Sequence, residues 1–227
     1  MYFENPDAVT VSEMDYLDVK NLARTGEGTF LEFKRTIPSA LKIAREMAAF
    51  ANTRGGTLLI GVDDDKTLIG VDGYQEEEFL LKKAARELCD PQIKFVMEIV
   101  HFGQRDLLVI KVPEAVEKPV FVCTKKGPVV YLREKDQNKT ASVERIRILE
   151  HKQSEKGVTF QYGHDEQSLF RYLNEYSEIS VEKFSHIIDK NERAAGDILV
   201  NLVSAGILKL LTKDNIDYFT FSHRCES

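Results

Sequence analysis

Apolar and polar residues alternate in short runs through the first part of the chain, and these runs predict two strands around one buried helix. Leu31 and Phe33 share one face of a short extended run, while the polar side chains beside them share the other. Apolar residues then recur at helical spacing over 39–54, up to a pair of glycines that favours a helix end. The apolar run 57–62 that follows is typical of a buried strand.

Further along, turn residues separate helical and extended patterns. A helix is predicted to begin at Ser12, with Asp15 three residues on, and to end near Arg24. The later pattern predicts a strand over 68–71 that pairs with 57–62, a helix over 75–88, hairpins over 92–112 and 119–133, and a short helix over 142–150. Together these elements predict an α+β domain at residues 1–152.

After a polar linker, the pattern changes to closely spaced helices. Helices are expected over 165–176, 180–189 and 192–205, followed by strands over 207–211 and 218–221. Three helices and a β-hairpin within such a short segment are typical of a winged helix-turn-helix. We therefore expect a second domain, a winged helix, at residues 163–227.

Charge is distributed unevenly along the chain. Its 227 residues carry a net charge of −6, which argues against a protein coated all over by nucleic acid. Residues 118–147, however, hold eight Lys or Arg against three Asp or Glu. This segment is the expected site of phosphate contacts, and a solvated hairpin and helix face is the alternative. The absence of a basic leader and of a run of about 18 apolar residues favours a cytoplasmic protein without a membrane span.

Acidic residues gather around the first two predicted strands. Glu27 and Glu32 lie five apart, and Asp63 to Asp65 follow the second strand. If the loop before the first strand lies beside the end of the second strand, these carboxylates come close together and repel one another. The repulsion is relieved only by a bound cation, by a neighbouring Lys or Arg, or by protonation. A cation would indicate metal-assisted phosphate chemistry, whereas neighbouring basic side chains would indicate structure alone.

Three linked motifs resemble the Schlafen-like, AlbA-type DNA-binding domain. They are Glu-Gly-Thr-Phe-Leu-Glu-Phe-Lys at 27–34, Ala-Phe-Ala-Asn-Thr-Arg-Gly-Gly at 49–56 and Leu-Ile-Gly-Val-Asp-Asp at 59–64. The sequence Tyr-Leu-Arg at 131–133 is similar to the closing strand of that family. The resemblance covers about residues 10–150 and implies a mixed-sheet fold. Bacterial members that carry a winged helix behind this domain are generally described as transcriptional regulators or nucleic-acid binders.

Animal Schlafen proteins in the same family include metal-dependent endoribonucleases that act on structured RNA. By position, Glu27, Glu32 and Asp64 match their catalytic acids, which implies Mg²⁺ or Mn²⁺ as the cofactor. The animal nuclease core joins two such lobes into a clamp, so that a single-lobed chain would need a homodimer. ATP hydrolysis has little support, because no Gly-x-x-x-x-Gly-Lys-Ser/Thr motif occurs.

These observations lead to a first hypothesis and two alternatives. The first is a nucleic-acid-binding protein, with DNA favoured over RNA, that regulates transcription as a homodimer. The second is a Mg²⁺- or Mn²⁺-dependent endoribonuclease that uses Glu27, Glu32 and Asp64, and the third is a protein-interaction adaptor. The residues expected to contact nucleic acid are Lys34, Arg35, Arg54, Lys118, Lys125, Lys126, Arg133, Lys135, Lys139 and, in the winged helix, Arg193.

Overall fold

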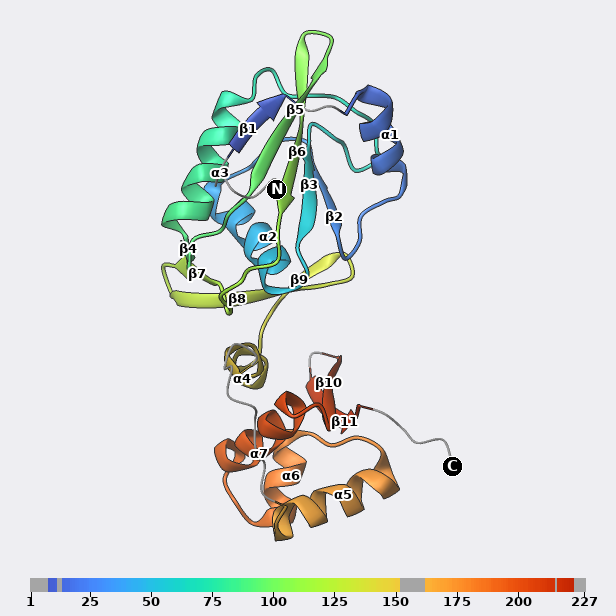
Figure 1. Ribbon diagram of the computed structural model, residues 1–227, viewed down its shortest axis with the longest axis vertical. Coiled ribbons are helices and arrows are strands. Elements are labelled where there is room, and N and C mark those ends of the chain that lie inside the picture. The colour runs from blue at the N-terminus through green and yellow to red at the C-terminus, as the bar shows by residue number, and fades with distance from the viewer. Residues whose placement is uncertain (1–7, 12–13, 152–161, 215, 223–227) are drawn as a thin grey trace. The chain divides into compact units, whose positions relative to one another are not determined.

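The structure, a computed structural model, describes residues 8–11, 14–151, 162–214 and 216–222 (Figure 1). The chain divides into two compact units, Met1–Ala141 and Ser142–Ser227. Each unit has a hydrophobic core of its own. The helix start expected at Ser12 and most of the expected linker lie outside the described residues.

A five-stranded mixed sheet forms the centre of the N-terminal unit. Its strand order is β1 (Ala8–Val11), β5 (Val96–Phe102), β6 (Arg105–Val112), β3 (Gly56–Ile60) and β2 (Leu31–Lys34). The outer pairs β1–β5 and β2–β3 are parallel, and the two inner pairs are antiparallel. A mixed sheet, as the resemblance implies, is therefore present.

Helices cover both faces of this sheet (Figure 1). On one face α1 (Tyr16–Arg24) packs its Val19 and Ala23 against a cluster that includes Leu31 and Phe33 of β2. On the other face α2 (Ala40–Asn52) and α3 (Gln75–Glu87) share the larger cluster with β3, β5 and β6. Because side chains alternate along a strand, Glu32 of β2 faces the α2 side between two residues of the α1 side.

A second, four-stranded sheet packs on α2. Its order is β4 (Cys89–Asp90), β7 (Phe121–Thr124), β8 (Gly127–Glu134) and β9 (Gln137–Thr140). Asn52, at the end of α2, donates from Nδ2 to the carbonyls of Val120 and Tyr131, at 2.9 and 3.0 Å, and accepts from the Val120 amide at 2.7 Å. This buried amide fastens the helix to the second sheet.

Within its described residues, the C-terminal unit contains four helices and a β-hairpin. The elements are α4 (Val143–His151), α5 (His164–Tyr176), α6 (Val181–Ile188), α7 (Glu192–Ser204), and the antiparallel strands β10 (Leu208–Lys213) and β11 (Ile216–Phe221). Ser180 and Asn191 cap α6 and α7 through their side chains. Helices α5 to α7 and both strands lie within a few residues of their predicted ranges.

The division between the units lies ahead of α4, whereas the sequence predicts this helix within the first domain. Arg145 of α4 pairs with Asp217 of β11, with 3.3 Å between Nε and Oδ1, and Arg147 pairs with Asp197 of α7 at 3.0 Å. The Ser142 hydroxyl also donates to Asp217 at 2.6 Å. These contacts join α4 to the C-terminal unit.

Further details differ from the predictions, which include no strand at β1 or β4. The strand predicted over 68–71 is wrong, because only isolated bridges join Val62 to Leu68 and Val71 to Asp106. Gly70 has a φ of +66°, which is incompatible with an extended strand at that point. Strand β9 has no counterpart in the predictions, since its four polar residues show no apolar alternation. None of the described helices is long and apolar enough to cross a lipid bilayer.

Candidate nucleic-acid interface

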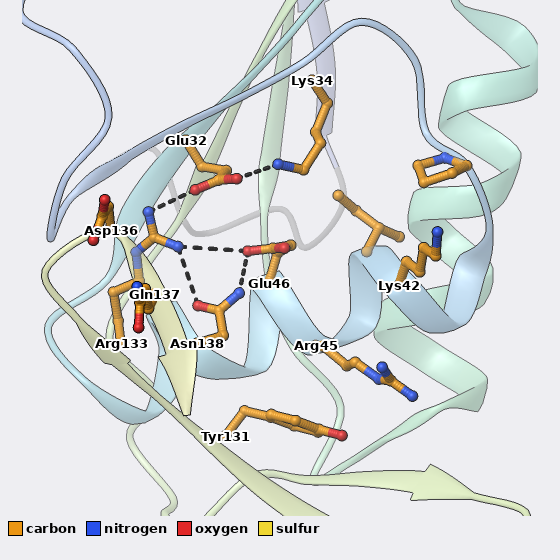
Figure 2. A pocket seen from close by; sticks show the side chains of 12 residues that line it. Glu32, Lys34, Lys42, Arg45, Glu46, Tyr131, Arg133, Asp136, Gln137 and Asn138 are labelled. Carbon is orange, nitrogen blue, oxygen red and sulfur yellow. Dashed lines mark hydrogen bonds and ion pairs between the residues drawn. The ribbon is translucent and has the colours of Figure 1, made fainter. Parts of the chain in front are cut away.

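A cleft of about 690 Å³ opens beside α2 in the N-terminal unit (Figure 2). Strand β2 and the β8–β9 hairpin form one wall, and the first half of α2 forms the other. The charged, amide and aromatic side chains that line it are Glu32, Lys34, Lys42, Arg45, Glu46, Tyr131, Arg133, Asp136, Gln137 and Asn138. This is the size range of ligand-binding clefts in proteins.

Arg133 is the centre of the first wall. Its guanidinium donates to the Glu32 carboxylate at 2.6 Å and to the Gly28 carbonyl at 2.8 Å through Nη2, and to Asn138 Oδ1 at 3.2 Å through Nη1. The side chain is 1% exposed, and its Cζ lies 5.0 Å from the centre of the Phe50 ring. Arg133, which the sequence places among the nucleic-acid contacts, is therefore an interior clamp whose donors point at protein acceptors.

Two carboxylates flank this arginine. Glu32 is buried and forms ion pairs with both Arg133 and Lys34. Glu46 lies 3.6 Å from Arg133 Nη1 and accepts a hydrogen bond from the Asn138 amide. Burial raises the pKa of Glu46, and the negative charge of Glu32 raises it further, while the Asn138 hydrogen bond opposes the shift. Two cations and two carboxylates therefore balance around Arg133, and α2 contributes one of them, the Glu46 carboxylate.

Two cations of α2, Lys42 and Arg45, lie outside that balanced group. Lys42 and Arg45 form no ion pair with any acidic group in the described part of the chain. The Arg45 Nε atom is buried and lacks a hydrogen-bond partner among the described residues, and its Cζ lies 5.6 Å from the Tyr131 ring centre. The first turn of α2 contains no acidic residue, so the positive end of the helix dipole adds to these charges.

Sequence reasoning missed both Lys42 and Arg45. The helical spacing that predicts the buried face of α2 also defines the opposite, polar face. Lys42, Arg45 and Glu46 all fall on that polar face, three or four residues apart. The signal for the α2 wall was therefore present, but the neighbouring strands were needed to show that this face borders a cleft.

The three matched acids do not form one group. Glu27 is exposed, and its Oε1 accepts from the Phe33 amide at 3.0 Å, which satisfies an outward N–H of edge strand β2. Glu32 is held by Arg133 and Lys34, and Asp64 is exposed in the turn after β3. Residues 14–151 and the other described segments contain no set of three His, Cys, Asp or Glu arranged to hold a metal ion.

The loops that carry these acids are nevertheless neighbours. Lys66, in the turn after β3, places its Nζ 3.4 Å from the carbonyl of Arg24, the last residue of α1, where the loop before β2 begins. Arg35 pairs with Asp63 at 2.9 Å at the end of β2. As the side chains lie, protein donors occupy the carboxylates of Glu27 and Glu32, and the residues do not fit a Mg²⁺ or Mn²⁺ site.

The remaining predicted contacts are scattered. Lys118 is 13% exposed and donates to the Thr53 carbonyl at 3.0 Å, at the end of α2, while Lys139 pairs with Glu134 at 3.3 Å. Lys125 and Lys126 precede the eight-residue strand β8 and Lys135 follows it, which separates Lys126 from Lys135 by about 30 Å. Exposed Arg54 lies elsewhere, after α2. Residues 118–147 therefore do not form one continuous basic surface.

In the C-terminal unit, α4 covers part of α7. Arg193 is exposed at the start of α7, but Asp197 pairs with Arg147 of α4. A Cβ atom at Gly196 would lie only 3.3 Å from Glu144 Oε1 of α4. The side of α7 near Gly196 is consequently occupied by a neighbouring helix.

Comparisons with known proteins found one matching family model and several similar solved structures. The model of the family described as Schlafen, AlbA_2 matches residues 27–142. The N-terminal domain of an ATP-dependent DNA helicase RecG-related protein from Nitrosomonas europaea is 23% identical, with a TM-score of 0.40 over 56% of this chain and 92% of that chain. The DIP2311 protein from Corynebacterium diphtheriae is 20% identical, with a TM-score of 0.41 over 60% of this chain and 30% of that chain.

Proposed function

The chain belongs to the Schlafen, AlbA_2 family, and we propose that its N-terminal unit binds nucleic acid through the cleft beside α2. The observation that carries this proposal is the pair of cations on the α2 wall, Lys42 and Arg45, which have no acidic partner within the described residues. Phosphate oxygens are the acceptors that such groups favour at the N-terminal end of a helix. Lys135, exposed beside the mouth residue Asp136, extends the same surface.

Charge arrangement supports this wall over the other. A phosphate on the β2–β8 wall would compete with Glu32 and Glu46 for Arg133, and it would meet their negative charge. A phosphate on the α2 wall would supply the acceptor that Arg45 Nε lacks. The proposed contacts therefore differ from most of those that the basic segment 118–147 predicts.

The test is oligonucleotide binding by two double variants of equal charge change. Lys42→Gln with Arg45→Gln removes the cations of the α2 wall, and Lys83→Gln with Lys94→Gln removes two exposed lysines that do not line the cleft. The affinity for labelled DNA and RNA is measured by fluorescence anisotropy. The first variant is expected to lose affinity by tenfold or more, because each charged contact contributes on the order of 1.5 kcal/mol to the binding free energy. Equal affinities of the two variants would overturn the proposal.

For the C-terminal unit we propose a winged helix that contributes a second nucleic-acid contact or the surface of a homodimer. The order of α5, α6, α7, β10 and β11 supports this assignment. Residues 160–227 hold seven Lys or Arg against eleven Asp or Glu, which disfavours phosphate contacts and favours the dimer surface. Light scattering of the full chain tests the dimer, and transcriptional regulation stays a prediction.

The endoribonuclease hypothesis also stays a prediction. Its test incubates the protein with tRNA and Mn²⁺, with and without chelator, beside an Asp64→Asn variant. Asp64 is exposed, so this substitution leaves the core intact. Chelator-sensitive cleavage that the variant lacks would support the hypothesis, and cleavage equal in both proteins would exclude a role for Asp64.

A further inference from the structure

The cleft beside α2 combines features that a simple phosphate-binding surface does not need. The Tyr131 ring lies on its floor, next to the planar guanidinium of Arg45 (Figure 2). Gln137 brings a side-chain amide to the wall facing α2, while the Asn138 amide is bound to Arg133 and Glu46. An aromatic ring, a planar cation and amide groups are the side chains that hold an unstacked base.

The number of available cations also limits the ligand. Proteins that grip a duplex neutralise roughly 6–10 phosphates along it. The cleft offers Lys42 and Arg45, and Lys135 is exposed next to the lining residue Asp136, but Lys126 lies about 30 Å from Lys135 along β8. Two or three phosphate contacts suit a few nucleotides of a flexible strand better than a rigid double helix.

The burial of Arg45 in the cleft also favours a single strand over a duplex. The Arg45 Nε atom is buried in the cleft wall and lacks an acceptor among the described residues. In a duplex the phosphates lie on the outside of a wide cylinder and the base faces are covered by their neighbours. A single strand can turn one nucleotide inward, so that its phosphate oxygen reaches Arg45 while its base meets Tyr131.

We propose that the cleft holds one unstacked nucleotide of a single-stranded nucleic acid, with the base against Tyr131 and the guanidinium plane of Arg45, and the phosphate between Arg45 Nε and Lys42. This inference rests on the proposed function, because it names the ligand of the same cleft. Stacking is tolerant of base identity, since every base has a π-face. The inference therefore predicts a preference for strand state and little preference for sequence.

The experiment compares a single-stranded 12-mer, with one 2-aminopurine, and the same sequence as a duplex. Binding by the full chain is expected to be at least tenfold tighter for the single strand and to change the 2-aminopurine fluorescence. Tyr131→Leu keeps an apolar side chain without the ring and is expected to weaken single-strand binding about tenfold. Arg45→Lys keeps the positive charge but removes the planar guanidinium, and it is expected to reduce the change in 2-aminopurine fluorescence on binding.

The matched control is Tyr74→Leu, because Tyr74 also packs partly buried against the large core cluster but does not line the cleft. Binding by Tyr74→Leu is expected to equal that of the unsubstituted chain. Binding that is tight but equal for duplex and single strand, or equal in Tyr131→Leu and Tyr74→Leu, would overturn this inference while leaving the proposed function standing. Failure of every oligonucleotide to bind would overturn both.

Discussion

The two walls of the cleft beside α2 handle charge in opposite ways. On the β2–β8 wall, Arg133 has Glu32, Glu46 and the Gly28 carbonyl as partners, and Lys34 also pairs with Glu32. On the α2 wall, Lys42 and Arg45 have no acidic partner within the described chain. Both walls border the same cavity of about 690 Å³, but the Arg133 side chain is only 1% exposed, whereas Lys42 is exposed.

The contrast separates charges that support the fold from charges that are available to a ligand. A buried ion pair that loses one partner leaves an uncompensated charge, which strongly destabilises the folded state. A cation without an acidic protein partner can be removed at little cost to the stability of the fold, because its removal leaves no carboxylate unpaired. Stability and ligand affinity should therefore respond to different residues of the same cleft.

The largest expected effect is on stability, from Arg133→Met. This substitution leaves Glu32 and Glu46 without their shared cation in a buried setting, and the free energy of unfolding is expected to fall by about 3–5 kcal/mol. Urea unfolding followed by circular dichroism measures it. The matched control is Arg54→Met at an exposed arginine, with an expected change below about 0.5 kcal/mol. Similar losses from the two substitutions would contradict the distinction between matched and unmatched charges.

A smaller effect is expected at the edge of β2. Glu27→Ala removes the acceptor of the Phe33 amide, and the free energy of unfolding is expected to fall by about 1 kcal/mol. Glu27→Gln keeps an acceptor oxygen and should lose less. If both substitutions leave stability unchanged, the Glu27 carboxylate does not support the edge strand and is free for another role.

The smallest effect concerns Glu46 and depends on pH. Burial raises its pKa above the ordinary value of 4.5, so the folded state holds the proton more tightly than the unfolded state. Stability from this group is therefore present below pH 4.5 and is lost as the pH rises through the folded pKa. Glu46→Gln removes that loss, so the stability of the variant relative to the unsubstituted chain should increase from pH 4 to pH 7. A relative stability that decreases over this range would contradict the assignment.

Much of the fold follows from local patterns in the sequence. The run from β2 through α2 to β3 is set by apolar spacing and by glycines that end the helix, and α5 to α7 are set by spacing and by polar caps such as Ser180 and Asn191. Strand β9 escapes such reasoning, because its pairing with β8 and not its own composition keeps it extended. The assignment of α4 depends on its long-range ion pairs with α7 and β11, which no local pattern contains.

The site was less predictable than the fold. Charge counting marks Arg133 and Lys118 as phosphate contacts, but both serve the interior. Arg133 binds Glu32, 101 residues away in sequence, and Lys118 binds the Thr53 carbonyl, 65 residues away at the end of α2. Counting also overlooks Lys42 and Arg45, whose importance depends on which strands face α2. A basic residue is available to a ligand only if folding leaves it without an acidic neighbour, and that is a property of tertiary structure.

The salt dependence of single-strand binding tests the central claim, that the α2 wall supplies the phosphate contacts, most directly. Affinities of the unsubstituted chain and of the Lys42→Gln, Arg45→Gln double variant would be measured across a series of salt concentrations. The plot of log affinity against log salt is expected to be shallower for the variant by about 1.4, from about 0.7 for each of two lost contacts on a single strand. Parallel lines for the two proteins would contradict the claim.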